Sequence, residues 1–549
     1  MTGYGSRARA IHVLQLTGVI LAVLIFFLAV LSFVLPLAKA FAPLVREGFP
    51  VSGYGIRRLA KITGYTFKEA AASTILALLL GIPAAFLVAR RNFPGRRLLA
   101  SFAAIPLCVP PLIVALGYIS SFGMAGYANR LLAPLTGGRS VNILYSFRGL
   151  VMAQGFYNFP IIMATVADSW GQLDDAQADS ARLLGAGEAR CFLSITLIQL
   201  LPSIISGAIT VFIYCFFSFM FVLLFGSTGG TTLEVAIYHA GRSQMQFTEA
   251  AALALLESTV AISALFFMSK TEDASKRLKG LSFRGASTKP RPVAKKEAPL
   301  VTTFLLVIAM FFVMPLLSIV ISSLTARTGG GRVFSLAAWR QLLAMGSFYL
   351  ALRNTLLVAA GTSLLSTTAA VAQSLLLALP PLKSKALFRT IPLLPLAVSS
   401  VLMGLGMTML VRRGHPAQLI LAQTALYWPF AFRQVQACMT KIPGNVTDAA
   451  AMLSPCRTDG LFRVMMPYCK RGIISGAGFC FAMSCSDATL PLVLSLYKFD
   501  TLSLFTYRLA GSYRLPQASA SGAVLGLFCT LAFALSNRAK MSKENHGIS

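Results

Sequence analysis

The sequence predicts an all-α integral membrane protein that consists of two similar halves. Of its 549 residues 56% are hydrophobic and only 12% are charged, and the mean hydropathy of +0.73 is too high for a soluble globular protein. Many apolar stretches reach the roughly 20 residues that a membrane-spanning helix needs. Their length, and the lack of short alternating segments, favours helices over a β-barrel. A polar segment also recurs 269 positions later in the chain.

We expect twelve membrane spans, six in each half. The first run follows Arg7 and Arg9 and is too long for a signal peptide, so we interpret it as an uncleaved span with a cytoplasmic amino end. Residues 41–69 would then be external, although five Lys and Arg residues there are unusual on that side. The expected spans are about 13–38, 70–90, 98–122, 145–167, 200–225, 249–269, 299–323, 351–380, 386–410, 417–437, 471–495 and 518–537.

The charge distribution defines the expected domains. Residues 1–269 form the first half, residues 299–549 the second, and residues 270–298 a basic linker rich in Ser, Gly and Pro that we expect to be flexible and cytoplasmic. The formal net charge is +30, and most Lys and Arg residues lie between apolar spans, as cytoplasmic loops do. No basic stripe is interleaved with aromatic residues in a soluble segment, which argues against nucleic-acid binding. Both termini are predicted to be cytoplasmic.

The repeated polar segment is expected to lie outside the bilayer. Residues 175–207 return as residues 445–476, so that Asp179 is placed on Asp448, and the pentapeptide IISGA is identical in both copies. The first copy predicts a short helix from Asp179 to Leu184, with Gly185 in the left-handed conformation at its end. In the second copy, Thr447 and Asp448 are good helix starters and Pro455 should stop the helix.

The repeat extends beyond this segment. AQGFYNFP at 153–160 matches AQTALYWP at 422–429 with the same shift, whereas upstream Thr74 aligns with Thr355 by a shift of 281. Because each half has an even number of spans, both halves enter the membrane in the same direction. The natural site for a substrate is therefore a pathway between them.

The residues argue against an enzyme. Nine cysteines are scattered without a C-x-x-C motif, and the four histidines are far apart, so we expect no metal site. There is no Walker A or dinucleotide-binding motif, so no cofactor site is expected in this chain. No catalytic residue is assigned. If ATP drives this protein, another subunit binds it.

The repeated segment resembles the coupling loop of binding-protein-dependent ABC importer permeases, E-A-A-x-x-x-G-x9-I-x-L-P. The matching residues are Asp179, Ser180, Ala181 and Gly185 within a first loop at about 169–199, and Asp448, Ala449, Ala450 and Ser454 within a second loop at about 439–470. Asp replaces Glu twice, and Ser replaces Ala and Gly once each. The resemblance implies two MetI-like halves in a bacterial inner membrane. It also implies two copies of a cytoplasmic ATPase, which bind ATP and magnesium, and an external substrate-binding protein.

Two halves in one chain narrow the resemblance to the fused permeases for iron(III) and for thiamine. The segment FGSTGGTTLEVAIYHA at 225–240 is similar to both, whereas GSYR at 511–514 and Asp487 look more like the thiamine permease. The expected substrate is thiamine or one of its phosphate esters, with iron(III) as the alternative. A secondary transporter is a further alternative, but it would have no reason to keep two coupling loops.

Four residues are candidates for the translocation pathway. Asp487 lies in an otherwise apolar span, and its counterpart by the 269 shift is Ser218. A carboxylate there suits a cationic thiazolium, with cation–π faces from the nearby Phe216, Phe217 and Phe219, but it could equally form a hydrogen bond to a neighbouring helix. Glu234 and Tyr238 are placed at the external rim, where Glu234 is more simply explained as a solvated charge.

Overall fold

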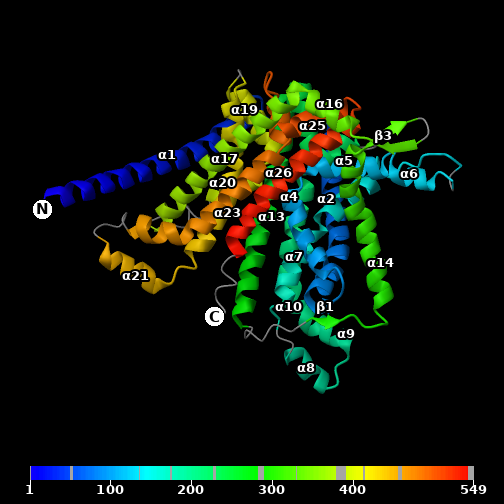
Figure 1. Ribbon diagram of the computed structural model, residues 1–549, viewed down its shortest axis with the longest axis horizontal. Coiled ribbons are helices and arrows are strands. Elements are labelled where there is room, and N and C mark those ends of the chain that lie inside the picture. The colour runs from blue at the N-terminus through cyan, green and yellow to red at the C-terminus, as the bar shows by residue number, and fades with distance from the viewer. Residues whose placement is uncertain are drawn as a thin grey trace. The chain divides into compact units, whose positions relative to one another are not determined.

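The computed structural model describes residues 2–49, 53–134, 137–173, 176–226, 230–281, 290–328, 331–378, 391–411, 414–454 and 460–541 (Figure 1). These residues are almost entirely helical. Nine of the described helical segments are long and apolar enough to cross a membrane. This confirms an all-α membrane protein, while the expected number of twelve spans stays a prediction. The nine segments are Ile20–Glu47, Gly55–Arg90, Pro111–Leu132, Phe147–Trp170, Glu188–Phe216, Phe247–Met268, Ala298–Ser323, Gly346–Leu377 and Leu515–Ala534.

The chain divides into two compact units. Unit 1 contains residues 1–48, 341–512 and 524–549, and unit 2 contains residues 49–340 and 513–523. The units do not follow the order of the chain. The first helix, α1, belongs to the unit that holds most of the second half, whereas α14 and α15, the first helices after the linker, belong to the unit that holds most of the first half.

Unit 2 has α2 at its centre. This helix packs most extensively along α7, and α10 contacts both. The contact between α2 and α7 is close because a Cβ on Gly81 would lie 2.7 Å from the Cβ of Ile162, and a Cβ on Gly155 would lie 2.7 Å from the side chain of Leu76. Small residues allow this approach in membrane helices. The elements of unit 2 are α2 (Gly53–Arg90), β1 (Arg91–Asn92), α3 (Arg96–Ser101), η1 (Phe102–Ala104), α4 (Ile105–Cys108), α5 (Pro111–Phe122), α6 (Tyr127–Leu132), α7 (Phe147–Trp170), α8 (Ala176–Leu183), α9 (Glu188–Cys191), η2 (Phe192–Thr196), α10 (Leu197–Phe216), α11 (Met220–Phe225), α12 (Leu233–Tyr238), η3 (His239–Ser243), α13 (Phe247–Leu281), β2 (Arg291–Pro292), α14 (Ala298–Ile308), η4 (Ala309–Val313), α15 (Met314–Ser323), β3 (Thr325–Thr328) and β4 (Gly331–Phe334), and α16 (Ala337–Ala344) joins the two units.

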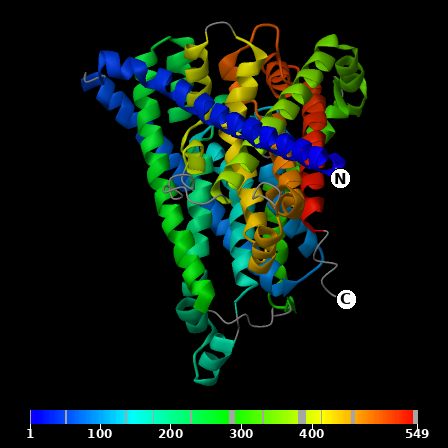
Figure 2. The same ribbon diagram turned by 90° about the vertical axis from the view of Figure 1, so that its left-hand side faces the viewer.

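Unit 1 is a bundle of α17, α20 and α23, and α1 runs across it (Figure 2). Its core is apolar and includes Trp428, whose ring meets that of Phe26 edge-on at 5.6 Å. Trp428 and Phe26 are each 1% exposed, so α1 is part of this core rather than an appended helix. The elements of unit 1 are α1 (Thr2–Glu47), α17 (Gly346–Ala378), η5 (Ile391–Leu393), η6 (Pro395–Ala397), α19 (Ser400–Leu410), α20 (Pro416–Met439), α21 (Gly444–Leu453), η7 (Leu461–Met465), α23 (Met466–Ser486), α24 (Thr489–Leu494), α25 (Leu502–Gly511) and α26 (Leu515–Met541), of which unit 2 holds the start as far as Ala523.

The corresponding exchange in unit 2 involves α15 and α5. The Ser318 hydroxyl donates a hydrogen bond to the Gly117 carbonyl at 3.0 Å, and the Tyr118 hydroxyl donates one to the Phe311 carbonyl at 2.7 Å. The Phe122 and Phe311 rings stack at 5.4 Å. The first span of the first half of the sequence, α1, is therefore part of the core of unit 1. The first span of the second half, α14 with α15, is part of the core of unit 2.

Several expected spans are interrupted. The stretch 200–225 is not one helix, because α10 ends at Phe216 and α11 begins at Met220, and the stretch 471–495 is likewise divided between α23 and α24. The stretch 98–122 breaks before α5, where Pro110 and Pro111 cannot continue a helix ladder. In the described part of the stretch 386–410, an α-helix begins only at Ser400, after the two short 3-10 helices η5 and η6, and residues 386–390 lie outside the described part.

Two further segments are more regular than expected. Residues 53–69, which were expected to be external, form the start of α2, where Glu69 is fully buried, while the side of the membrane on which they lie stays a prediction. The linker is also not flexible at its ends, since residues 270–281 continue α13 and β2 pairs in parallel with β1. A two-pronged ion pair between Arg91 and Glu297, with N–O distances of 2.9 and 2.8 Å, holds the end of the linker against α2. Residues 282–289 lie outside the described part.

Candidate coupling and pathway sites

The first coupling loop contains the short helix α8, which begins at Ala176 and has Asp179 in its first turn. It ends as predicted, with Gly185 at φ +89°. The amide of Gly185 donates to the Arg182 carbonyl at 2.9 Å, and the amide of Ala186 donates to the Ala181 carbonyl at 3.0 Å. These two bonds form a Schellman motif, which needs a left-handed residue where Gly185 stands.

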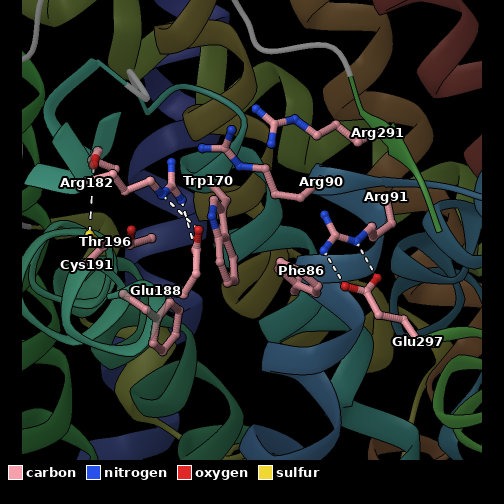
Figure 3. A pocket seen from close by; sticks show the side chains of 12 residues that line it. Phe86, Arg90, Arg91, Trp170, Arg182, Glu188, Cys191, Thr196, Arg291 and Glu297 are labelled. Atoms are coloured by element: carbon pink, nitrogen blue, oxygen red, sulfur yellow. Dashed lines mark hydrogen bonds and ion pairs between the residues drawn. The ribbon is translucent and has the colours of Figure 1, made fainter. Parts of the chain in front are cut away.

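Arg182 joins α8 to α9 (Figure 3). Its guanidinium forms an ion pair with Asp179 at 2.6 Å and with both carboxylate oxygens of Glu188 at 3.0 Å. The hydrogen bonds that Arg182 donates to Glu188 and then to Asp179 raise its pKa. The exposed carboxylate of Asp179 therefore has a partner within the loop itself, the guanidinium of Arg182.

The loop is also tied to the span that follows it. The Gln199 amide on α10 donates to the Gln177 side-chain oxygen on α8 at 2.7 Å. Between α9 and α10 the chain makes a π-helical turn at Phe192–Thr196, and the second half has a π-helical turn at Leu461–Met465, 269 residues later. Such turns are frequent at functional sites in helices. The repeat thus includes the joint between coupling loop and span.

The second coupling loop contains α21, which starts at Gly444, earlier than Thr447 and Asp448 predicted. Pro443 precedes it in an extended conformation, and the Thr447 hydroxyl donates to the Gly444 carbonyl inside the first turn at 2.7 Å. The helix ends at Leu453, and Ser454 leaves it in an extended conformation, as the residue before a proline does. Pro455 itself lies outside the described residues.

The two coupling helices share an exposure pattern. Asp179 and Asp448 are exposed, whereas Ala181 and Ala450 are half-buried. Ser180 and Ala449 are also exposed. The Ser180 hydroxyl donates a hydrogen bond to the Ala176 carbonyl at 2.8 Å. The structure therefore places the first three matched residues of each loop on one short helix, and the fourth, Gly185 or Ser454, just after its end.

Both helices end in a pair of exposed apolar side chains that sequence reasoning missed. Leu183 and Leu184 are 88% and 90% exposed, and Met452 and Leu453, at the equivalent positions, are 87% and 84% exposed. Leucine at the end of a helix is unremarkable in a sequence, so only the repeat of an apolar pair in both copies could have indicated this surface. We call these four residues the apolar tips.

Asp487 lies in unit 1 at the break between α23 and α24. One carboxylate oxygen accepts from the amides of Thr489 and Leu490 at 2.9 and 3.2 Å, and the other accepts from the Gln423 amide at 3.1 Å. Asp487 therefore caps the start of α24 and is hydrogen-bonded to α20 through Gln423. This agrees with the alternative that the carboxylate bonds to a neighbouring helix. Gln423 in turn accepts from the hydroxyls of Thr362 and Ser484.

The remaining pathway candidates lie in unit 2. Ser218 occupies the break between α10 and α11, where its amide donates to the Cys215 carbonyl at 3.0 Å. Tyr238 lies close by, since its ring meets that of Phe219 at 5.3 Å. Glu234 is 2% exposed, so the expectation of a solvated rim charge is wrong. Phe216 and Phe219 are 1% and 4% exposed and belong to the core.

Buried polar groups on α2 and α7 were not foreseen. Glu69 accepts a hydrogen bond from the Ser73 hydroxyl at 2.9 Å, but its other carboxylate oxygen and both side-chain polar atoms of Gln154 have no hydrogen-bond partner within the described residues. The signal was a glutamate followed directly by three alanines, at 69–72. Because residues 41–69 were expected to be external, Glu69 was not considered as a buried residue of a span.

Comparison with known proteins agrees with this architecture. The family model described as binding-protein-dependent transport system inner membrane component matches residues 77–270. The thiamine transport system permease protein ThiP of Brucella abortus (strain 2308) is 26% identical over 521 residues, which cover 90% of this chain and 91% of that protein. The protein of the same name from Escherichia coli (strain K12) is 24% identical over 487 residues, 86% of this chain and 87% of its own length.

A shorter match involves only part of the chain. The molybdenum transport system permease protein ModB of Escherichia coli (strain K12) is 33% identical over 147 residues, which are 27% of this chain and 63% of that protein. The two ThiP proteins therefore match nearly the whole chain, whereas ModB matches about a quarter of it. The chain is thus similar to the binding-protein-dependent transport system inner membrane components over residues 77–270, and to permease proteins over nearly its whole length.

Proposed function

We propose that this chain forms the translocation pathway of an ATP-driven importer for thiamine or its phosphate esters. The substrate rests on the relatives named as thiamine permeases, which match 90% and 86% of the chain. An external binding protein would deliver the substrate. A cytoplasmic ATPase, in two copies that bind ATP and magnesium, would supply the energy, and both chain termini would face the cytoplasm.

The observation that carries the coupling role is the pair of apolar tips. An exposed leucine or methionine side chain is stabilised by roughly 1.5–3 kcal/mol when it becomes fully buried. Two such residues stand side by side at the end of each coupling helix, 84–90% exposed, and the surface of a polar loop gives no other reason to keep them. We infer that each tip inserts into an apolar groove of one ATPase copy.

The loop geometry supports transmission of movement. Arg182 makes α8 and α9 one body, and the bond between Gln199 and Gln177 links that body to α10. A push on α8 would therefore reach α10 through the π-helical turn rather than be lost in a flexible loop. In the second half, α21 leads to α23 through the equivalent turn. Alternating access would follow when ATP closes the ATPase dimer.

The substrate is tested by reconstitution. The chain is placed in vesicles with its ATPase and binding protein, and uptake of labelled thiamine and of labelled iron(III) is measured with and without ATP. We expect ATP-dependent uptake of thiamine and not of iron(III). Uptake driven by an ion gradient in vesicles without the ATPase would instead establish a secondary transporter.

The coupling role is tested with the double variants Leu183→Asn/Leu184→Asn and Met452→Asn/Leu453→Asn. Each should weaken ATPase binding by about 100-fold or more, because roughly 3 kcal/mol or more of apolar burial is lost. Membrane insertion should be unchanged, since all four side chains are exposed. The matched control is Val45→Asn, which replaces an apolar residue that is 85% exposed on α1. ATPase binding at wild-type strength in both double variants would exclude the apolar tips as the contact.

A further inference from the structure

A group of buried polar side chains on α2 and α7 in unit 2 is only partly hydrogen-bonded. Glu69, Gln154 and Asn158 are 0%, 1% and 3% exposed. The Ser73 hydroxyl donates to one Glu69 oxygen at 2.9 Å, and the Asn158 side-chain amide donates to the Gln154 backbone carbonyl at 3.0 Å. The other Glu69 oxygen, both polar atoms of the Gln154 side chain and the Asn158 side-chain oxygen have no hydrogen-bond partner within the described residues. We call Glu69, Gln154 and Asn158 the polar cluster.

The polar cluster lies at the middle of a candidate span, beside a broken helix. Asn158 stands at the centre of the span Phe147–Trp170, and its side-chain amide donates to the Cys215 sulfur on α10 at 3.5 Å. Glu69 lies within electrostatic range of the same thiol. The helix α10 ends one residue later, at the break that separates it from α11. Interrupted helices near the middle of the bilayer are where transporters commonly bind their substrates.

The equivalent positions in unit 1 show how such side chains meet. The helices α2 and α17 align by a shift of 289, because each has a threonine hydroxyl that accepts from the first amide of α12 or of α25. Ser73 therefore corresponds to Thr362, and by the shift of 269 Gln154 corresponds to Gln423. In unit 1 the Thr362 hydroxyl donates to the Gln423 side-chain oxygen at 3.1 Å. The same register places the corresponding pair of unit 2 side by side, and with it the Glu69 carboxylate that holds Ser73.

The two units differ in how completely these groups are bonded. In unit 1 the Gln423 side chain bonds to a carboxylate and two hydroxyls. In unit 2 the Ser73 hydroxyl is used by Glu69, and Cys215 stands where unit 1 has the second hydroxyl. The unbonded atoms of the polar cluster are three oxygens and one amide nitrogen. Buried polar groups without partners are costly and are kept where a function requires them, and a ligand that satisfies this set must bring mainly hydrogen-bond donors.

We propose that the polar cluster binds the aminopyrimidine group of the substrate on its way through the chain, an inference that rests on the proposed transport of thiamine. Thiamine carries an amino group beside a ring nitrogen, and a thiazolium cation. A glutamine amide forms paired hydrogen bonds with such an amino group and ring nitrogen, as it does with adenine. The Gln154 oxygen and the second Glu69 oxygen would accept from the amino group, and the Gln154 nitrogen would donate to the ring.

The charge of Glu69 suits the same ligand. In the low dielectric of a span, a carboxylate attracts a cation far more strongly than it does in water. The polar cluster is buried in this structure, so it would meet the substrate when α2, α7 and α10 move apart during alternating access. Asp487 cannot take this role in unit 1 without giving up the amides that it caps.

Binding to the purified full-length chain in nanodiscs tests this proposal without any transport measurement. The thermal unfolding temperature is measured with millimolar thiamine, and with oxythiamine, an analogue that has a carbonyl in place of the amino group. The variants are Glu69→Gln, which keeps an acceptor for the Ser73 hydroxyl, and Gln154→Met, which keeps the length of the side chain. The matched control is Glu249→Gln, the same change at a partly exposed carboxylate that pairs with Arg58 at 3.3 Å.

We expect thiamine to stabilise the wild-type chain more than oxythiamine does. Each variant of the polar cluster should weaken thiamine binding about tenfold or more, whereas the control should bind as the wild type does. Glu69→Gln should also lose the preference for thiamine, because an amide can donate to the carbonyl of oxythiamine. Without ligand, Gln154→Met should unfold at a higher temperature than the wild type, because it removes two unbonded buried polar atoms.

Equal effects of the two ligands on the wild-type chain, or thiamine binding at wild-type strength in both variants, would overturn the proposal. A lower unfolding temperature of Gln154→Met with unchanged binding would also overturn it, since the polar cluster would then be purely structural. Uptake by the reconstituted wild-type chain separates this inference from the proposed function. Preserved binding without ATP-dependent uptake would refute thiamine transport alone, and normal uptake without a binding preference would refute the role of the polar cluster alone.

Discussion

Asp487 provides the sharpest test of how the broken spans are held. Its carboxylate accepts from two backbone amides at the start of α24 and from the Gln423 amide. Asp487→Ala removes the acceptor of all three bonds, and of the three donors only the Gln423 amide keeps another acceptor, the Ser484 carbonyl at 3.5 Å. Loss of a helix cap costs about 0.5–2 kcal/mol and an unsatisfied buried amide about 1–3 kcal/mol, so we expect a loss of roughly 2–5 kcal/mol of stability. Asp487→Asn keeps the cap oxygen and loses only the bond from Gln423, so it should cost about 1–2 kcal/mol.

The assay combines thermal unfolding in nanodiscs with thiamine uptake per folded protein. The unfolding temperature should fall in the order wild type, Asn variant, Ala variant, and uptake by the Asn variant should stay within about twofold of wild type. Asp500→Asn is the control, because its half-buried carboxylate pairs with the exposed Arg508, and an ion pair with an exposed partner should contribute about 1 kcal/mol or less. If the Asn variant unfolds at the wild-type temperature but takes up thiamine at a small fraction of the wild-type rate, the carboxylate acts on the substrate and the cap explanation is wrong.

Three further predictions follow from single positions. Gly185→Ala forces a side chain into the left-handed region at φ +89° at a cost of about 1–2 kcal/mol, so ATPase-coupled uptake should fall, whereas Gly187→Ala, at φ −68° with open space, should leave uptake unchanged. Phe26→Ala should lower the unfolding temperature through a loss of about 3–5 kcal/mol, but Phe27→Ala, 56% exposed, should not; equal effects would contradict the place of α1 in the core of unit 1. The pKa of Glu297 is lowered by its hydrogen bonds from Arg91, so its contribution is present above the unfolded pKa of about 4.3 and is lost as the pH falls through the folded value. Hydrogen exchange over residues 291–297 should quicken at acidic pH in the wild type and be pH-independent in Glu297→Gln, apart from intrinsic exchange.

The fold class and the coupling helices could be predicted because both leave strong local signals. Apolar runs of span length need no tertiary information. Gly185 after a short helical pattern is a known end signal, and the structure has it in the predicted conformation. The repeat added a second copy of each signal, which is why α21 was found although its exact start was misplaced by residues that can also stand inside a helix.

The broken spans could not be predicted from hydropathy, because a break inside an apolar stretch does not change its composition. Pro110 and Pro111 were a usable signal for one break. At the other sites the break depends on tertiary partners such as Gln423, which lies 64 residues from the carboxylate it holds. The exchange of α1 between cores likewise has no local signal, since an apolar helix fits either core equally well by composition.

The alignment of the two halves is corrected by their hydrogen bonds. The Thr66 hydroxyl accepts from the Leu233 amide at 2.9 Å, and the Thr355 hydroxyl accepts from the Leu502 amide at 2.7 Å. Leu233 and Leu502 differ by 269 positions, so Thr355 corresponds to Thr66, with a shift of 289, and not to Thr74. Residue identity alone gave the wrong alignment because Thr occurs at several positions along these helices.

With the corrected shift, the buried charges of the two halves occupy different positions. Position 358 holds Val where the first half has Glu69, and Ser218 stands where the second half has Asp487. A buried carboxylate is costly in a membrane span and is kept only where a partner or a function requires it. The Gln423 side chain is satisfied by Asp487 and two hydroxyls, but the side chain of its counterpart Gln154 lacks hydrogen bonds within the described residues. Duplication therefore preserved the frame of helices and coupling loops, while the polar interior of each half diverged, so the repeat predicts where a span lies and not what its interior can bind.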